Sequence, residues 1–184
     1  MTEFHILMVV AVVAAALAFG FALRGIAAGA RAMPKAGEMA PPFTLPNERG
    51  TPVSLSSFQG KWVVLYFYPK DMTSGCTIEA HNFQRDLEKY AALNAEIVGV
   101  SLDSVKSHEK FCAKGKLHFT LLSDHGERKV SKDYGVLANL MGFKMDKRVT
   151  FLIDGEGKIA KVWTSVNPMN HSRQVLAELE KLKM

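Results

Sequence analysis

Hydrophobic residues along the chain follow three patterns. Several short runs are apolar at nearly every position and rich in β-branched and aromatic residues, which is typical of strands buried on both faces of a sheet. Other stretches repeat apolar residues every three or four positions, as amphipathic helices do. One long apolar run stands apart at the N-terminus. The pattern therefore predicts buried strands, helices and one further segment.

The short apolar runs predict the strands. The clearest run is WVVLYFY at 62–68, and it stops at Pro69, which cannot continue a central strand. Later runs are EIVGVSLD at 96–103, FTLLSD at 119–124, RVTFLID at 148–154 and KIAKVWTSV at 158–166. Before all of these, alternating residues on either side of a turn at 47–50 predict two short strands.

Helical spacing begins at Cys76. Apolar residues recur from there at intervals of three and four up to Ala91, so we expect one helix over 74–91. Further helices are expected in 104–116 and 127–136, and from about Asn170 onward. Strands that alternate with helices and end in a hairpin indicate an α/β fold, in which a central mixed sheet carries helices on both faces.

The long apolar run, from Phe4 to Leu23, contains no formal charge. As a helix it would span roughly 30 Å, about the thickness of a bilayer core. It offers no polar face, which argues against a buried helix of a soluble protein. We therefore expect a membrane helix or signal segment in residues 1–32, an Ala-, Gly- and Pro-rich linker over 33–39 and one domain over 40–184.

The flanks of this run bear on its orientation. A secretory signal begins with a basic region, but here the positive residues Arg24, Arg31 and Lys35 follow the run. The positive-inside rule then favours an uncleaved anchor with the domain in the cytoplasm. The sequence Ala30-Arg31-Ala32 has the small-x-small form of a cleavage site, so a periplasmic or exported domain is the alternative.

Composition and charge restrict the class of the domain. A chain that is 48% hydrophobic and 22% charged can bury a core and is not disordered. The formal net charge is +5, and the basic residues are interleaved with acidic ones along the sequence, as in QRDLEKY. Such a mixed surface argues against nucleic acid as a partner.

The stretch FYPKDMTSGCTIEA, residues 67–80, carries the candidate chemistry. Pro69 ends the strand and the hydroxyl of Thr73 can cap the helix, which places Cys76 in the first helical turn. Unpaired amides and the helix dipole stabilise a thiolate there, so Cys76 is a candidate nucleophile. The alternative is a buried structural cysteine.

FYPKDMTSGCTIEA and RVTFLID together resemble a peroxiredoxin of the bacterioferritin comigratory protein type, also called the Q type, within the AhpC/TSA-like superfamily. Pro69, Thr73 and Cys76 match its Pro-x3-Thr-x2-Cys pattern, while Arg148 and Glu79 match its arginine and glutamate. The resemblance implies a thioredoxin-like fold. It also implies a thiol peroxidase, largely monomeric, that reduces hydrogen peroxide and organic hydroperoxides without a cofactor or metal.

The chemistry explains these residue types. A thiolate attacks one peroxide oxygen while negative charge develops on the other, so fixed donors must follow both. Arg148 supplies permanent charge and several donors, and the resemblance gives Thr73 a donor role and Glu79 an orienting role. Each residue also has a structural alternative. Arg148 could instead form an ion pair with Asp146, and Thr73 could serve only as a helix cap. Glu79 could be a favourable charge near the helix N-terminus, and Pro69 could end the strand without shielding the sulfur.

Attack leaves a sulfenic acid on Cys76 that another thiol must resolve. Some family members carry the resolving cysteine five positions later, where this chain has His81, while others carry it on the following helix, where Cys112 lies. The resemblance therefore implies a Cys76–Cys112 disulfide, formed by local unwinding and reduced by thioredoxin or a similar protein. A disulfide that must be reduced in each cycle favours a cytoplasmic location of the domain, because the cytosol supplies reductants most readily. Alternatively, Cys112 is a buried structural residue.

Two other functions remain open on the same fold. One is a Sco-like copper chaperone with Cys76, His81 or Cys112 as soft ligands, although such proteins carry Cys-x3-Cys and this chain has Ala80 at the fourth position. The other is a membrane-tethered redox sensor without turnover. Catalytic peroxide consumption separates the enzyme from both.

Overall fold

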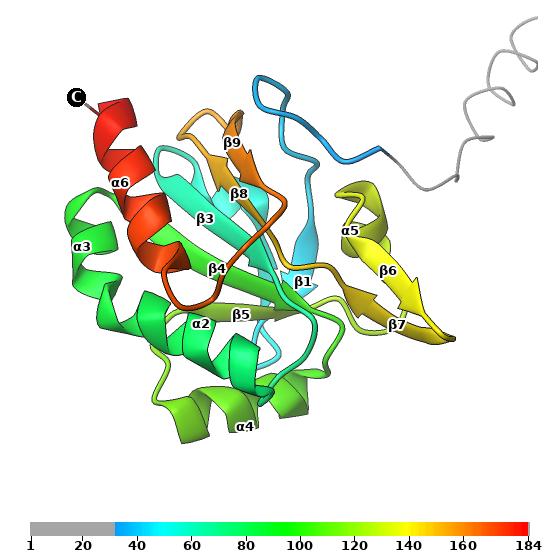
Figure 1. Cartoon of the computed structure of the whole chain (residues 1–184). Helices are drawn as coiled ribbons and strands as arrows, with labels where there is room; N and C mark the ends of the chain where they lie inside the picture. Colours follow the sequence, from blue (N-terminus) through cyan, green and yellow to red (C-terminus); the bar gives the residue numbers. More distant parts are fainter. Residues whose placement is uncertain (1–31, 184) are drawn as a thin grey trace, which may run out of the picture. The chain divides into compact units, whose positions relative to one another are not determined.

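The computed structural model describes residues 32–183. Its centre is a five-stranded mixed sheet in the order β5-β4-β3-β8-β9 (Figure 1). Strands β3, β4 and β5 run parallel, whereas β8 and β9 are antiparallel to their neighbours. Their bounds are Trp62–Phe67 for β3, Ala95–Ser101 for β4, Thr120–Ser123 for β5, Val149–Ile153 for β8 and Ile159–Trp163 for β9. All five predicted strands of the sheet are confirmed.

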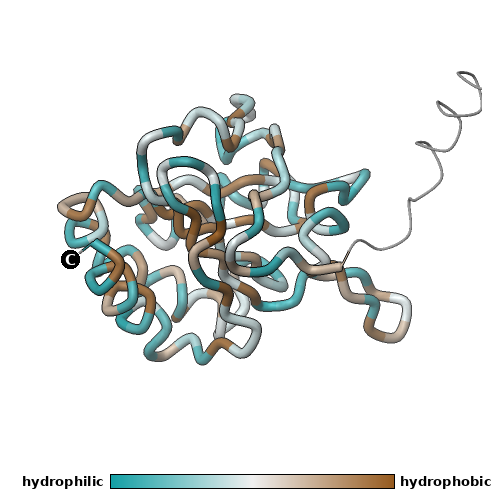
Figure 2. The backbone as a smooth tube through the Cα atoms, turned by 90° about the horizontal axis from the view of Figure 1, so that it is seen from above, coloured by the Kyte–Doolittle hydropathy of each residue, from teal (hydrophilic) through white to brown (hydrophobic). Residues whose placement is uncertain are grey.

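Two hydrophobic layers cover the sheet. One layer packs alternate β3 side chains, Val64 and Tyr66, against four helices. These are α2 (Ser74–Arg85), α3 (Leu87–Ala92), α4 (Val105–Gly115) and α6 (His171–Lys183). The most hydrophobic stretches of the chain run through the interior of the domain (Figure 2). Because successive side chains of a strand point to opposite faces, β3 is apolar at both parities, as its sequence predicts.

The other layer packs Val63 and Leu65 of β3 against shorter elements. These are α5 (Lys129–Asp133), the hairpin of β1 (Thr44–Pro46) and β2 (Pro52–Ser54), and the 3-10 helix η1 (Leu55–Phe58). Helices of the described residues therefore lie on both faces of the mixed sheet, with four α-helices on one face and the short α5 and η1 on the other.

The helix expected over 74–91 is divided in two at Asp86. The carboxylate of Asp86 is buried, and it accepts hydrogen bonds from Arg85, Lys89 and the hydroxyl of Ser172 on α6. These bonds tie the break to another helix. Helical periodicity alone does not register such a break, because the apolar spacing continues across it.

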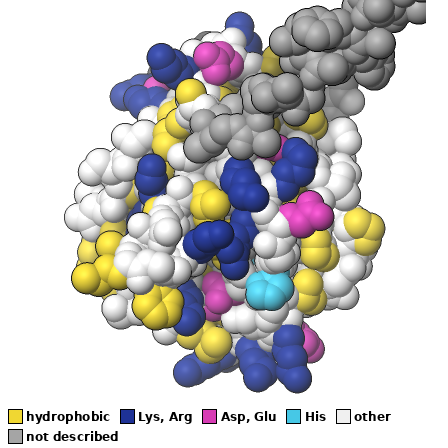
Figure 3. All heavy atoms as spheres, turned by 90° about the vertical axis from the view of Figure 1, so that its right-hand side faces the viewer, with side chains coloured by type: hydrophobic (Ala, Val, Ile, Leu, Met, Phe, Trp, Pro, Cys, Tyr) yellow, Lys and Arg dark blue, Asp and Glu magenta, His cyan; other side chains and the backbone are white. Residues whose placement is uncertain are grey.

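A hairpin of β6 (Leu137–Leu140) and β7 (Phe143–Asp146) is a feature that the hydrophobic pattern did not predict. Its turn residues Met141 and Gly142 both have positive φ, at 52° and 89°. Met141 is 92% exposed and Phe143 is 74% exposed. Figure 3 views the side of the domain toward which this hairpin points, where basic side chains gather among scattered acidic and hydrophobic ones.

Residues expected to form the linker over 33–39 lie against the sheet. The amide of Gly37 donates to the carbonyl of Ile159 at 2.8 Å, and the amide of Ile159 donates to Glu38 at 2.9 Å. The domain thus extends before residue 40. The apolar segment and the predicted membrane helix fall outside the described residues. Within 32–183, no helix combines the length and hydropathy needed to cross a bilayer.

Candidate active site

Cys76 lies where the sequence predicts it, in the first turn of α2. The chain leaves β3, turns sharply at Met72, whose φ is +59°, and enters the helix after Thr73. The side chain of Cys76 is only 2% exposed and packs into the helical layer of the core. A sulfur at this position faces the amide end of the helix, which favours negative charge.

Arg148 reaches Cys76 because of strand pairing. Strand β8 runs antiparallel to β3 with Phe67 opposite Val149, so the residue before Val149 lies beside the chain that leaves β3. Its Nη2 donates a hydrogen bond to Cys76 Sγ at 3.2 Å. The guanidinium thus places a permanent positive charge and a hydrogen-bond donor against the sulfur.

Glu79 holds the other side of the same guanidinium. It lies one turn after Cys76 on the same face of α2, and its Oε2 accepts from Arg148 Nη1. Burial raises the pKa of Glu79 to about 7, against the opposing charge and hydrogen bond of Arg148. The contact is a buried ion pair rather than an exposed charge at a helix end, and Asp146 makes no ion pair with Arg148.

Thr73 occupies the N-cap position with extended backbone, and its carbonyl accepts from the amide of Thr77 at 2.9 Å. The expected cap through its hydroxyl is wrong, because the side chain makes no capping bond. The hydroxyl instead donates to the carbonyl of Lys70 at 3.0 Å, which tightens the loop before the helix. Pro69 is half-buried and follows the end of β3.

Cys112 lies on α4, half-buried against the same core layer as Cys76, and both thiols are free. Burial, with smaller effects of Glu48 and Asp71, raises the pKa of Cys112 to about 12. Together with Glu48 and Arg49, Cys112 lines a surface hollow of about 500 Å³. Such a raised pKa favours the neutral thiol of Cys112.

Sequence reasoning missed a buried polar cluster between the two cysteine-bearing elements. The carboxylate of Asp71, in the loop before α2, accepts from the hydroxyl of Tyr68 at 2.7 Å. Asp71 Oδ2 also lies 2.9 Å from Nδ1 of His108, on α4. The only signal in the sequence is that His108 falls one helical turn before Cys112, on the side predicted to be buried.

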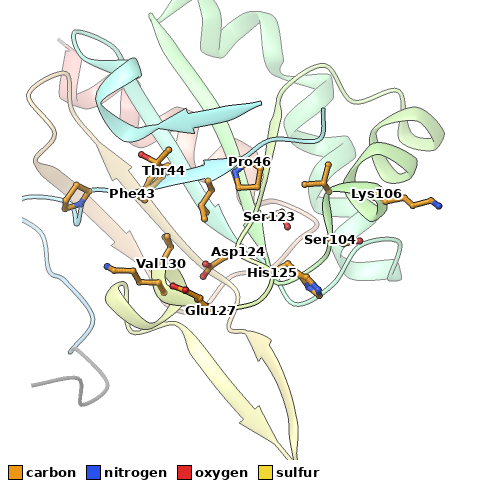
Figure 4. A pocket seen from close by; sticks show the side chains of 14 residues that line it. Phe43, Thr44, Pro46, Ser104, Lys106, Ser123, Asp124, His125, Glu127 and Val130 are labelled. Carbon is orange, nitrogen blue, oxygen red and sulfur yellow. The ribbon is translucent and has the colours of Figure 1, made fainter. Parts of the chain in front are cut away.

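A larger cavity, of about 640 Å³, lies at the end of β5, between α5 and the start of α4. Its walls come from β1, α5 and the chain around Asp124 and His125 (Figure 4). None of the six residues predicted for the site lines it. The thiol chemistry is therefore separate from this cavity.

Metal ligation finds no support in residues 32–183. No three His, Cys, Asp or Glu side chains in this range come together as ligands. The soft ligands considered for copper, Cys76, His81 and Cys112, are thus not assembled into a site.

Known proteins match both the sequence and the fold. A model of the AhpC/TSA family matches residues 36–162. The chain belongs to the AhpC/TSA family. Peroxiredoxin Q, chloroplastic, from Sedum lineare is 46% identical over 148 residues, which make up 80% of this chain and 78% of that protein. Peroxiredoxin Bcp from Bacillus subtilis is 43% identical over 148 residues, 78% of this chain and 94% of that protein.

A solved structure gives the same result. The bacterioferritin comigratory protein of Xanthomonas campestris, determined for insight into its alkyl peroxide reduction activity, superposes with a TM-score of 0.73 and 34% identity. The match covers 84% of this chain and 99% of that one. The predicted resemblance and the thioredoxin-like fold are confirmed, and the chain is a peroxiredoxin of the Q type, a peroxidase among the oxidoreductases.

In this peroxiredoxin the structure joins three of the six predicted residues by direct contacts: Cys76, Arg148 and Glu79. Thr73 and Pro69 belong to the loop that delivers Cys76. Cys112 belongs to a neighbouring helix and makes no disulfide in this state.

Proposed function

We propose that this peroxiredoxin reduces hydrogen peroxide and organic hydroperoxides through Cys76. The observation that carries the proposal is the 3.2 Å contact between Cys76 Sγ and the Arg148 guanidinium at the start of α2. The thiolate attacks one peroxide oxygen and the O–O bond breaks. The departing oxygen takes a proton and leaves as water or an alcohol, while Cys76 becomes a sulfenic acid.

In this displacement, Arg148 acts on both the attacking sulfur and the peroxide oxygens. Its remaining N–H groups lie beside the sulfur, where they can donate to the peroxide oxygen on which charge develops. Glu79 fixes the plane of the guanidinium from behind, which keeps these donors aimed. Thr73 and Pro69 shape the loop around the sulfur, and the hydroxyl of Thr73, which donates to the carbonyl of Lys70 in this structure, can turn to donate to an incoming peroxide instead.

Cys112 resolves the sulfenic acid in the second step. Its thiol sulfur attacks the Cys76 sulfur, water leaves, and a disulfide forms between the two residues. Because Cys112 is held on a different helix, α4 must unwind locally before the sulfurs can meet. A dithiol reductant of the thioredoxin type then reduces the disulfide and returns both thiols.

The N-terminal segment supplies the cellular context. We propose that the apolar run 4–23 tethers a monomeric domain to a membrane, with the catalytic domain on the cytoplasmic side. The basic residues after the run support this orientation. Cleavage near residue 32 and release into the periplasm is the opposing outcome, and N-terminal sequencing of the mature protein distinguishes the two.

The test of function is peroxide reduction by the domain coupled to thioredoxin and its reductase. After one equivalent of hydrogen peroxide, non-reducing peptide mapping locates any disulfide. Repeated turnover with a Cys76–Cys112 crosslink is the expected result. Turnover without that crosslink would make Cys112 structural and an external thiol the resolving group. A single oxidation without turnover would support the redox sensor instead.

A further inference from the structure

A buried ion pair joins the loop that precedes Cys76 to the helix that carries Cys112. His108 of α4 is fully buried, and its Nδ1 lies 2.9 Å from Asp71 Oδ2. Its other ring nitrogen, Nε2, lies 3.2 Å from the carbonyl oxygen of Leu122 on β5. Asp71 is 4% exposed and its carboxylate also accepts from Tyr68.

The hydrogen-bond pattern assigns the charges of this pair. Burial acts to raise the pKa of Asp71, but hydrogen bonds from His108, Ser107 and Tyr68 hold it below its ordinary value, which favours the carboxylate. A carbonyl oxygen can only accept, and so can a carboxylate. An imidazole that faces one of each must donate from both nitrogens, which only the protonated ring can do. The hydrogen-bond pattern therefore favours the protonated ring of His108.

The Asp71–His108 pair holds the part of α4 that would have to unwind to release Cys112. His108 lies one turn before Cys112, and the start of α4 is further held by Ser104, whose Oγ accepts from the amide of Ser107. The amide of Asp71 donates to Asp103 Oδ2, just before α4, at 2.8 Å. Within the described residues, no side-chain hydrogen bond fixes α4 between His108 and its end at Gly115.

We propose that the Asp71–His108 ion pair is a latch that holds α4 closed and thereby sets how often Cys112 is released to resolve Cys76. Unwinding through His108 withdraws the imidazolium and leaves Asp71 as a buried, unpaired carboxylate, which opposes opening. His108 is thus a positioning residue for the second half of the reaction. This inference rests on the proposed role of Cys112 as the resolving cysteine.

The latch predicts a kinetic separation that a general structural role would not produce. Weakening it releases Cys112 more often and speeds disulfide formation. The first step, oxidation of Cys76, does not require α4 to open and stays unchanged. Since the closed helix belongs to the reduced state, weakening the latch also makes the disulfide harder to reduce.

The test uses the full chain in detergent micelles with His108→Leu, which removes both hydrogen bonds, and His108→Gln, which keeps one neutral bond. Hydrogen exchange over 105–115 and the rate of disulfide formation by rapid quench are both expected to rise at least about tenfold in His108→Leu. A smaller rise is expected in His108→Gln, and this variant carries the test if His108→Leu does not fold. A tenfold shift of the closed state corresponds to a reduction potential lower by about 30 mV.

Two variants provide the controls. In a Cys112→Ser background, the rate at which peroxide oxidises Cys76 should change less than about twofold on His108→Gln, because that rate reports the first step alone. Tyr134→Phe removes a buried hydrogen bond to the carbonyl of Pro41 without touching α4, and it should leave exchange in α4 unchanged. Both results support a latch specific to α4.

Unchanged exchange and unchanged disulfide formation in both His108 variants would overturn the proposal. Equal slowing of oxidation and of disulfide formation would also overturn it, because that result describes a general support of the fold. If the unaltered chain oxidises Cys76 but forms no disulfide, the role of Cys112 fails instead. Faster exchange of α4 in the His108 variants would in that case still establish the latch.

Discussion

The two cysteines occupy contrasting environments within one core layer. Cys76 begins α2 and accepts a hydrogen bond from the guanidinium of Arg148. Cys112 lies near the end of α4 beside Glu48, and burial with nearby acids raises the pKa of its thiol to about 12. The two side chains share an element type and a hydrophobic layer, but Cys76 contacts a cation, whereas the pKa of Cys112 is set mainly by burial, and Cys112 lies near both Glu48 and Arg49.

In the proposed reaction, this difference in environment gives Cys76 and Cys112 different roles. Cys76 has a permanent cation and a helix N-terminus beside its sulfur, whereas burial and nearby carboxylates raise the pKa of the Cys112 thiol. Keeping Cys112 neutral also protects it from direct oxidation, because the thiolate is the form that reacts with peroxide. The comparison predicts that charge, rather than position in the sequence, decides which cysteine reacts first.

Replacing the cation at Cys76 should produce the largest effect. Arg148→Lys keeps a positive charge but loses the planar fork that contacts both Cys76 and Glu79, so we expect kcat/KM for hydrogen peroxide to fall about 100-fold. Steady-state turnover measures it, with Arg173→Lys, an exposed arginine of α6, as the matched control. Unchanged turnover in Arg148→Lys would remove this residue from the mechanism.

Removing the charge behind Arg148 should produce a smaller effect that depends on pH. Burial raises the pKa of Glu79 to about 7, so the carboxyl is neutral below that pH and charged above it. Glu79→Gln resembles the neutral form, and its rate of Cys76 oxidation should match the unaltered protein near pH 5.5 and fall about tenfold below it at pH 8.5. Stopped-flow oxidation measures this ratio.

A matched control for this pH profile is Glu180→Gln, which neutralises an exposed acid on α6. It should leave the ratio flat across the range. A loss in Glu79→Gln that is equal at pH 5.5 and pH 8.5 would mean that the shape of Glu79, and not its charge, orients Arg148.

Neutralising the anion near Cys112 should change its reactivity modestly. In a Cys76→Ser background, Glu48→Gln removes one of the charges that, after burial, raise the pKa of Cys112. The rate of alkylation by iodoacetamide at pH 9 should rise roughly threefold, since about half a pKa unit is recovered. The exposed and distant Glu156→Gln should not alter it, and an equal rise in both variants would point to a general charge effect.

The smallest effect on activity is expected at Asp146, which lies two residues before Arg148. Burial raises the pKa of Asp146 to about 7, and neither of its oxygens has a hydrogen-bond partner in the described residues. The folded state therefore binds more protons than the unfolded state between about pH 4 and 7, so this group lowers stability as pH rises through that window.

Asp146→Asn removes this penalty. We expect the free energy of unfolding to rise by up to about 4 kcal/mol at pH 8 and to stay unchanged near pH 4, as measured by urea denaturation. Turnover should change less than about twofold, because Arg148 pairs with Glu79 and not with Asp146. A large loss of turnover would show that Asp146 acts on Arg148 after all.

Much of this arrangement could be predicted from local signals. The apolar run of β3 and the helical spacing after Cys76 predict which side chains are buried, and the motif residues predict the contact between Cys76 and Arg148. What the pattern does not report depends on tertiary contacts. The break at Asp86 follows from its bonds to side chains of three helices, and the pairing of Asp71 with His108 follows from the packing of α4.

The N-cap and the β6–β7 hairpin show a second kind of limit. Thr73 has the residue type and backbone of a cap, but its hydroxyl has a competing carbonyl at Lys70 within reach. The hairpin turns at Met141, whose positive φ is unusual for its residue type. In both places the chain adopts one of several locally accessible conformations, and hydrophobic periodicity does not indicate which one.

The central claim, that Cys76 attacks peroxide and Cys112 does not, is tested most directly by single-turnover oxidation of two variants. One equivalent of hydrogen peroxide is mixed with Cys112→Ser or Cys76→Ser, and sulfenic acid is trapped and mapped by mass spectrometry. The account predicts that Cys112→Ser consumes the peroxide at the rate of the unaltered protein with all label on Cys76, while Cys76→Ser consumes none on that timescale. Rapid oxidation of Cys112 in the Cys76→Ser variant would contradict it.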